Sequence, residues 1–230
     1  MDQTPLFDTT RIRAPKAVVS IDAVSDAWKK WHTVQNYSFG KDRGSLPMIA
    51  DLQALHPYFR DKVFELVRLC KAAGIRLSIV ESYRTPSKQA EYYAMGKKYT
   101  GTPGGKSRHQ YGVAVDVVPM VNSVAVWNNP RLWRKIGVIG EGLGLRWGGR
   151  WRVPYDPGHF EWSAGLSKEA REEGAIPAMP LGVIDQYPDL DAQLRLLQTY
   201  WNAWEVEQSM IANKGMATGR VEPEGGGVGK

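Results

Sequence analysis

Apolar spacing and helix-capping residues predict three helices between residues 57 and 142. Over residues 57–73 the apolar residues lie three or four positions apart, with a proline at the start and a glycine beyond the end, which predicts a helix. Residues 85–96 and 129–142 each open with a capping residue followed by proline and close at a glycine, so they predict two more helices.

Strand patterns lie between and after these helices. Residues 75–81 largely alternate apolar and polar side chains, which predicts a strand with one buried face. Residues 113–118 are almost wholly apolar and predict a central strand, with 123–127 as its hairpin partner. Shorter strands are predicted over 145–147 and 159–162. This order indicates an α+β fold with a small, mainly antiparallel sheet flanked by helices, plus an extra C-terminal helix.

Proline, glycine and the apolar pattern divide the chain into five parts. The predicted parts are an N-terminal arm with a short helix from Asp22 to Thr33 (1–45), a core domain (46–165), a proline-rich extended linker (166–188), a helix (189–213) and a flexible tail (214–230).

The helix predicted over 189–213 has an apolar seam. Its large apolar residues are separated by alternating steps of four and three: Leu190, Leu194, Leu197, Trp201 and Trp204. Such a seam packs against another apolar surface. That surface belongs either to the protein's own domain, or to a second copy or a larger assembly.

Composition fits a globular protein. The chain has 230 residues, of which 43% are hydrophobic and 23% charged, and a net charge of +6. A single cysteine, Cys70, excludes an intramolecular disulfide and a cysteine-based zinc site, and its helical pattern predicts a buried thiol. The basic residues form no run and no nucleic-acid-binding motif is present, so we do not expect nucleic-acid binding.

Membrane and export signals are also missing from the pattern. No window approaches the roughly 18 apolar residues of a transmembrane helix. Met1 to Pro5 provide neither a cationic start nor an apolar segment, so we expect no secretory signal and synthesis in the cytoplasm.

Two short stretches combine histidines with carboxylates. His109 precedes Asp116 by seven residues, and His159 lies between Asp156 and Glu161. Catalytic zinc sites use three histidine or carboxylate ligands and keep one position open, and His109, Asp116 and His159 supply such a set. A carboxylate in an apolar strand is costly to bury without a cation or hydrogen-bond donors. The alternative is a buried histidine with a hydrogen-bonded aspartate.

The second stretch offers two further roles. Because side chains alternate along a strand, Glu161 shares a face with His159 and could orient that ligand. Asp156 lies three residues before His159 in a Pro-Gly turn, where it could act as a general base. His32 and His56 have no such neighbours, and we expect them at the surface or in helix caps.

These motifs together resemble a known family. The pattern Ser107-x-His109-x-x-Gly112-x-Ala114-x-Asp116, then Trp147-Gly148-Gly149-x-Trp151, then Asp156-x-x-His159-Phe160-Glu161 is similar to zinc peptidases of peptidoglycan. These comprise D-alanyl-D-alanine carboxypeptidases and dipeptidases of the VanY/VanX type and the phage L-alanyl-D-glutamate endopeptidases used as endolysins. The endolysin branch is the better match, and the resemblance covers about residues 46–162.

The resemblance implies roles for single residues and a DD-peptidase/hedgehog-like fold. His109, Asp116 and His159 would bind Zn2+, and Asp156 would be the catalytic base. Arg84 would face the scissile carbonyl, and Gln89 would lie near the site. Ser107 would either hydrogen-bond the substrate or hold the loop. The N-terminal arm and the seam helix are additions that a compact endolysin does not need.

The expected function is a zinc endopeptidase that cuts peptidoglycan stem peptides at the L-alanyl-D-glutamate bond, as a phage-type lysin. The alternatives are a D,D-carboxypeptidase or dipeptidase, and an inactive wall-binding module of a virion. The protein would reach the wall after release from the host cytoplasm or as part of a phage particle. Five tryptophans either line the substrate groove or belong to the core: Trp127, Trp133, Trp147, Trp151 and Trp162.

Overall fold

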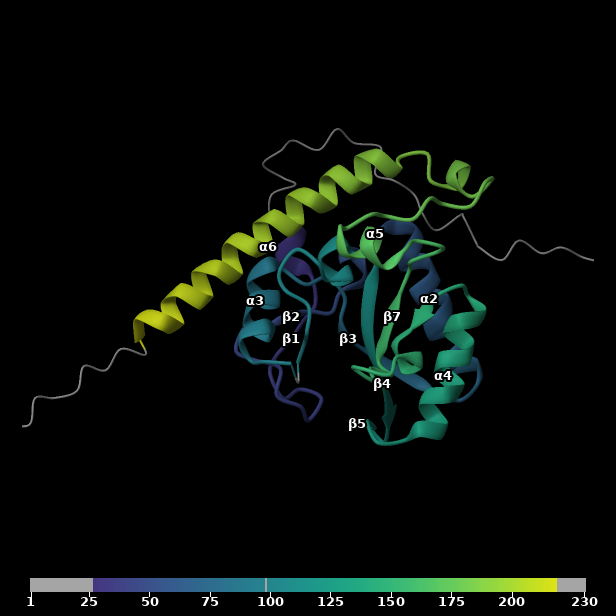
Figure 1. Ribbon diagram of the computed structural model, residues 1–230, viewed down its shortest axis with the longest axis horizontal. Helices are drawn as coiled ribbons and strands as arrows, with labels where there is room; N and C mark the ends of the chain where they lie inside the picture. Colours follow the sequence, from purple (N-terminus) through teal and green to yellow (C-terminus); the bar gives the residue numbers. More distant parts are fainter. Residues whose placement is uncertain (1–26, 98, 219–230) are drawn as a thin grey trace, which may run out of the picture.

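A five-stranded antiparallel sheet forms the centre of the molecule (Figure 1). The computed structural model describes residues 27–97 and 99–218. The strands lie in the order β3 (Arg76–Glu81), β4 (Ala114–Val121), β7 (His159–Glu161) and β6 (Arg146–Trp147), and β5 (Val124–Ala125) pairs with the end of β4. The predicted α+β fold, the central strand and its hairpin partner are therefore confirmed.

Two helices cover one face of this sheet, α2 (Pro57–Ala72) and α4 (Pro130–Gly142). Phe160 of β7 packs so closely on α4 that a Cβ at Gly140 would overlap its ring, so only glycine fits there. Side chains alternate along β7, and His159 and Glu161 therefore point to the opposite face. Asp116 lies directly across from His159 in the register of β4 and β7.

Local signals placed the helix starts correctly. Thr85 caps α3 (Pro86–Ala94) by accepting a hydrogen bond from the backbone of Lys88. Asn129 caps α4 in the same way. Short 3-10 turns connect the main elements: η3 (Leu52–Ala54), η4 (Arg108–Tyr111) and η5 (Gly148–Arg150).

The N-terminal part of the described chain belongs to the fold, so the predicted boundary at residue 46 is wrong. β1 (Thr33–Val34) pairs with β2 (Met48–Ile49). The helix predicted from Asp22 to Thr33 is described only from residue 27, where a single 3-10 turn, η2 (Ala27–Lys30), is followed by β1. Packing decides this local structure, because Trp28 in this turn is buried against α6.

The segment 166–188 is not an extended linker. It contains α5 (Lys168–Glu172) and η6 (Ile184–Gln186), and it packs on the domain. The hydroxyl of Tyr187 donates to Asp61 at 2.7 Å, and Arg108 donates to the carbonyl of Ala175 at 2.8 Å. The prolines of this segment, Pro177, Pro180 and Pro188, prevent a long helix but not packing on the domain.

The seam helix, α6 (Leu190–Thr218), packs on its own chain. Leu197, Trp201 and Trp204 of the seam are buried in a second apolar cluster together with Trp28 and Tyr83. Figure 1 shows α6 crossing the domain beside α3 and projecting beyond it at its C-terminal end. The helix continues through 214–218, so the tail predicted from residue 214 is helical there, and 219–230 lie outside the described residues.

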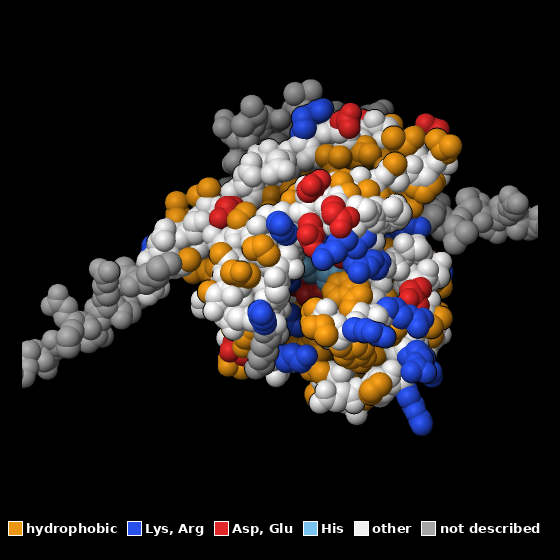
Figure 2. All heavy atoms as spheres, in the orientation of Figure 1, with side chains coloured by type: hydrophobic (Ala, Val, Ile, Leu, Met, Phe, Trp, Pro, Cys, Tyr) orange, Lys and Arg blue, Asp and Glu red, His pale blue; other side chains and the backbone are white. Residues whose placement is uncertain are grey.

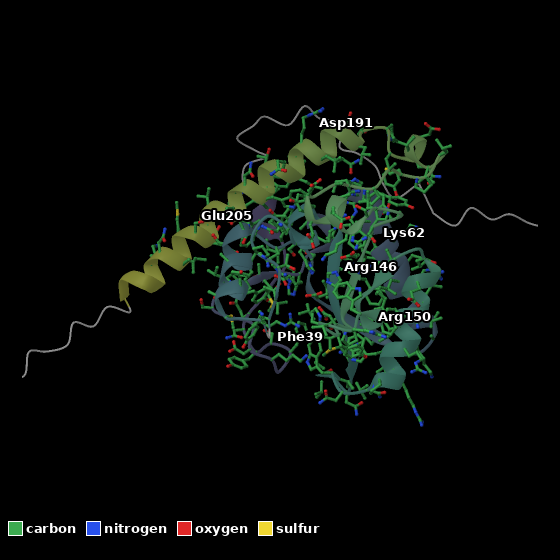
Figure 3. The ribbon with its side chains drawn as sticks, in the orientation of Figure 1. Phe39, Lys62, Arg146, Arg150, Asp191 and Glu205 are labelled. Carbon is green, nitrogen blue, oxygen red and sulfur yellow. The ribbon has the colours of Figure 1, made fainter. Side chains whose placement is uncertain are left out.

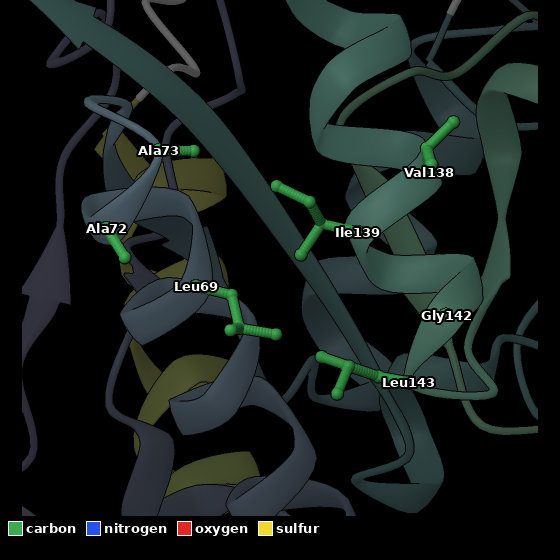
Figure 4. A pocket seen from close by; sticks show the side chains of 7 residues that line it. All are labelled: Leu69, Ala72, Ala73, Val138, Ile139, Gly142 and Leu143. Atoms are coloured by element: carbon green, nitrogen blue, oxygen red, sulfur yellow. The ribbon is translucent and has the colours of Figure 1, made fainter.

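A surface depression of about 540 Å3 lies between α2 and α4 (Figure 4). Its lining is apolar and includes Leu69, Ile139 and Leu143. It therefore offers no catalytic group. Among the described residues, no helix is long and apolar enough to cross a membrane.

Candidate active site

Three side chains from separate elements converge on one point. His109 lies in η4, Asp116 in β4 and His159 in β7. His109 Nε2 is 3.3 Å from Asp116 Oδ1 and 3.3 Å from His159 Nδ1, and His159 Nδ1 is 3.1 Å from the same Asp116 oxygen. All three side chains are buried. These potential ligand atoms surround a common point, as the predicted metal site requires.

Hydrogen bonds fix the orientation of both imidazoles. His109 Nδ1 is 2.8 Å from the carbonyl oxygen of Ser82, which only accepts, so this nitrogen carries the proton. His159 Nε2 is 3.1 Å from Glu161 Oε2 and donates to it. Each ring therefore presents the lone pair of its other nitrogen to the centre, which is the arrangement that a metal-binding histidine needs.

The electrostatics of the cluster favour a bound cation. Burial lowers the pKa of His159, but Asp116 and Glu161 outweigh burial and raise it to about 10, so without a metal the ring holds a second proton, which a bound cation would replace. Burial likewise raises the pKa of Asp116, yet the two histidines hold it well below its usual range. The Asp116 carboxylate thus stays ionised, and a positive charge beside it stabilises it. The donor set of two imidazoles and one carboxylate fits zinc.

Glu161 lies where the strand alternation predicted. Its second oxygen accepts from Arg146 of the neighbouring strand β6 at 2.8 Å (Figure 3). Burial raises the pKa of Glu161, but His159 and Arg146 together lower it to about 2. An ionised Glu161 therefore holds His159 in place.

Arg84 is held at one side of the cluster. Its guanidinium pairs with Glu81, donates a hydrogen bond to Gln89 Oε1 at 3.0 Å, and lies 3.6 Å from Asp116 Oδ2. Burial disfavours its charge, but Glu81 raises the pKa of Arg84 above its ordinary value. Gln89 also donates to the carbonyl of Thr102 at 2.5 Å. Gln89 thus lies behind Arg84 and holds both the arginine and the following loop.

Asp156 lies in the turn before β7. Its backbone N–H donates to Gly148 at 3.2 Å, and its carbonyl accepts from His159 at 3.2 Å. Burial and the neighbouring charge of Asp116 raise the pKa of Asp156. A carboxyl whose pKa is raised is suited to accept and return a proton. Ser107, also buried, caps η4 at its N-terminus.

Three charged residues beside the cluster were not predicted. Glu81 is the last residue of β3 and is fully buried, and the sequence alone gave no sign of this burial. Lys41 and Arg43 lie in a glycine-containing loop that was assigned to the arm. Arg43 Nη1 is 3.9 Å from Asp116 Oδ2. The pairing of β1 with β2 and hydrogen bonds from Lys88 and Trp127 hold this loop beside the site.

The five tryptophans divide between the core and the site. Trp133, Trp147 and Trp162 are buried in the main apolar cluster. Trp151 is half-buried, with its ring centroid 5.0 Å from that of His159. Trp127 is half-buried as well, under Lys41. Figure 2 shows this face hollowed, with histidine and acidic side chains at the bottom and Lys and Arg side chains around it.

Comparison with known proteins agrees with this site. The profile of the M15 peptidases, described as D-alanyl-D-alanine carboxypeptidase, matches residues 100–162, which contain all three ligands. Residues 100–162 of this chain are therefore similar to the M15 peptidases. The predicted family of zinc metallopeptidases is thus confirmed.

Individual proteins of known identity are similar to part of this chain. The peptidoglycan L-alanyl-D-glutamate endopeptidase CwlK of Bacillus subtilis is 28% identical, across 50% of this chain and 76% of that protein. The L-Ala D-Glu endopeptidase ChiX of Serratia marcescens is 28% identical, across 49% and 83%, with a TM-score of 0.39. VanYB in complex with D-alanine-D-alanine is 19% identical, across 61% and 80%, with a TM-score of 0.36.

Proposed function

We propose that this protein is a zinc-dependent endopeptidase that hydrolyses the L-alanyl-D-glutamate bond of peptidoglycan stem peptides. The observation that carries the proposal is the convergence of His109, Asp116 and His159, with Arg84 and Asp156 beside them. The choice of bond is supported by the name of CwlK, which matches over 76% of its length.

The charged residues divide the reaction between them. Zinc held by His109, Asp116 and His159 would supply a Lewis acid. Asp156 accepts a proton as the oxygen of water attacks the carbonyl carbon of L-alanine. It then returns this proton to the nitrogen of D-glutamate as the C–N bond breaks. Arg84 places a fixed positive charge beside the carbonyl oxygen, which becomes negative in the transition state.

The bond specificity is tested by digesting purified peptidoglycan and identifying the products by mass spectrometry. Cleavage between L-alanine and D-glutamate is expected. Release of terminal D-alanine alone would support instead the D,D-carboxypeptidase function, which the description of the family profile favours.

Asp156→Asn tests catalysis by this site. The amide cannot accept the proton, so we expect loss of at least about 100-fold in rate with zinc still bound. Asp185→Asn is the matched control, because Asp185 is exposed on η6. If Asp156→Asn clears cell-wall suspensions as fast as the wild type, hydrolysis does not go through this site. If the wild type itself binds the wall but does not clear the suspension, the protein acts as a wall-binding module.

We also propose that the enzyme is a phage-type lysin. It reaches the cell wall after release from the host cytoplasm or as part of a phage particle. Mass spectrometry of purified particles distinguishes these routes, since only the second leaves the protein in the particle. Absence from the particles together with failure to lyse cells from within would reject both.

A further inference from the structure

We propose that Lys41 and Arg43 bind the free carboxylate of the substrate residue that follows the scissile bond. This inference rests on the proposed peptidase function and defines its substrate further. Both residues belong to the loop over residues 35–47, which joins β1 to β2 and is here called the cationic loop.

The cationic loop lies at the edge of the active site. The carbonyl of Phe39 accepts a hydrogen bond from Trp127 Nε1 at 2.8 Å, and Figure 3 shows Phe39 near the strands that carry the site. The ammonium of Lys41 lies 3.7 Å from the centroid of the Trp127 ring, and the guanidinium carbon of Arg43 lies 5.4 Å from it. Trp127 thus forms an apolar platform for both cations.

A buried lysine holds the cationic loop in shape. Lys88 of α3 is almost completely buried, and its ammonium donates to the carbonyls of Arg43 and Leu46 and to Glu91. Glu91 in turn accepts from the backbone N–H of Ser45 at 2.5 Å and of Leu46 at 3.1 Å. Burying an ammonium is costly unless it is fully hydrogen-bonded. The hydrogen bonds from Lys88 to the carbonyls of the cationic loop therefore fix the conformation of this loop.

Gly44 also fixes the conformation of the cationic loop. Its φ is +79°, and a Cβ there would lie 2.5 Å from the Glu91 carboxylate. Only glycine allows the carboxylate to approach the backbone this closely. The cations are therefore presented by a loop of fixed shape.

The cations have capacity for a ligand. Arg43 Nη1 is 3.9 Å from Asp116, beyond hydrogen-bond distance, and within the described part of the chain Arg43 Nε has no hydrogen-bond partner. Lys41 is exposed at the tip of the loop. An anion on this side would receive charge-assisted hydrogen bonds from both residues.

The position of Asp156 identifies that anion. Trp127, which lies under Lys41 and Arg43, packs against the turn that carries Asp156, because a Cβ at Gly158 would be 3.8 Å from its ring. Both cations also interact with the charge of Asp156, the group that returns a proton to the leaving nitrogen. They therefore lie on the leaving-group side, whereas Arg84 lies beside the carbonyl. In L-alanyl-D-glutamate the carbon bonded to the scissile nitrogen carries the α-carboxylate, which stays free when the chain continues from the side-chain carboxyl. A D-alanyl-D-alanine terminus has a carboxylate at the same place.

The test compares two synthetic stem peptides, one with a free α-carboxylate on D-glutamate and one with a carboxamide there. The wild type should prefer the acid, and Lys41→Met with Arg43→Met should reduce the acid-to-amide ratio of kcat/KM by about 10- to 100-fold. Lys41→Arg should keep most of the preference. Lys62→Met is the matched control, because Lys62 lies on α2 over Tyr58.

Two outcomes would overturn the proposal. One is a wild type that cleaves acid and amide equally well. The other is a double variant whose kcat/KM falls equally for both peptides, so that its acid-to-amide ratio is unchanged. That result would show that the cationic loop only supports the fold. Zinc content and circular dichroism of each variant identify misfolding.

An error in the proposed bond specificity can be distinguished from an error in the role of Lys41 and Arg43. If the wild type removes only terminal D-alanine, the same variants are compared on D-alanyl-D-alanine peptides ending in a carboxylate or an amide. Binding of acid and amide peptides to Asp156→Asn, measured by calorimetry, gives the same ratio without turnover. Equal binding of both peptides would reject the role of Lys41 and Arg43.

Discussion

Trp201→Ala tests whether α6 is part of the catalytic domain. The Trp201 ring stacks on Tyr83 with centroids 4.7 Å apart, and its Nε1 donates to the carbonyl of Ala54 at 3.0 Å. A Cβ at Gly112 would lie only 2.7 Å from this ring. Trp201 therefore contacts the residue before Arg84 and the turn that follows His109.

The structure sets the size of the effect. Truncation of a buried tryptophan to alanine destabilises a protein by roughly 3–5 kcal/mol, which includes the cavity that remains. The Ala54 carbonyl also loses its donor, at a cost of about 1 kcal/mol. We expect the free energy of unfolding to fall by about 5 kcal/mol, a large part of the roughly 5–15 kcal/mol of an ordinary domain.

Urea denaturation followed by far-ultraviolet circular dichroism measures this loss. With a slope near 3 kcal/mol per molar urea, the midpoint should fall by more than about 1 M. Trp201→Phe keeps an aromatic ring against Tyr83 and should lose about half as much. Met210→Ala is the control on the exposed side of α6 and should change the midpoint little. A shift for Trp201→Ala as small as that of Met210→Ala would refute the integration of α6.

Three further predictions concern the metal site and pH. Glu161→Gln removes the charge that holds His159, so zinc affinity measured by chelator competition should fall about 10- to 100-fold, whereas Glu141→Gln on the surface of α4 should not change it. Removal of zinc by a chelator leaves Asp116 without its cation, so activity and melting temperature should both fall, and Zn2+ but not Mg2+ should restore them; recovery with Mg2+ would contradict the donor set. Burial, and then Arg60, lowers the pKa of His56 from 6.5 to about 4, so the neutral ring contributes stability that is complete above pH 6.5 and is lost as the pH falls towards 4. Between pH 6.5 and pH 5 this group should account for about 2 kcal/mol, measured as the difference in pH dependence between the wild type and His56→Asn, and identical pH dependence would exclude it.

Local patterns determined most of the secondary structure and the ligand set. The caps at Thr85 and Asn129 start helices because they satisfy N–H groups within the same turn. The alternation of β7 placed Glu161 beside His159 for an equally local reason. An aspartate within an apolar strand pointed to a cation before any contact was known.

Tertiary structure decided which surfaces meet. The seam of α6 left two partners open, and only the fold shows that it covers Tyr83 and Ala54, with Thr85 hydrogen-bonded to Gln208. Residues 27–45 were predicted to belong to an arm, because their contacts are with α3 and α6, which are distant in the sequence. Periodicity describes which face of an element is apolar, whereas the partner of that face depends on packing between distant segments. For this reason the sequence predicted the zinc ligands, and only the structure brought Lys41 and Arg43 beside them.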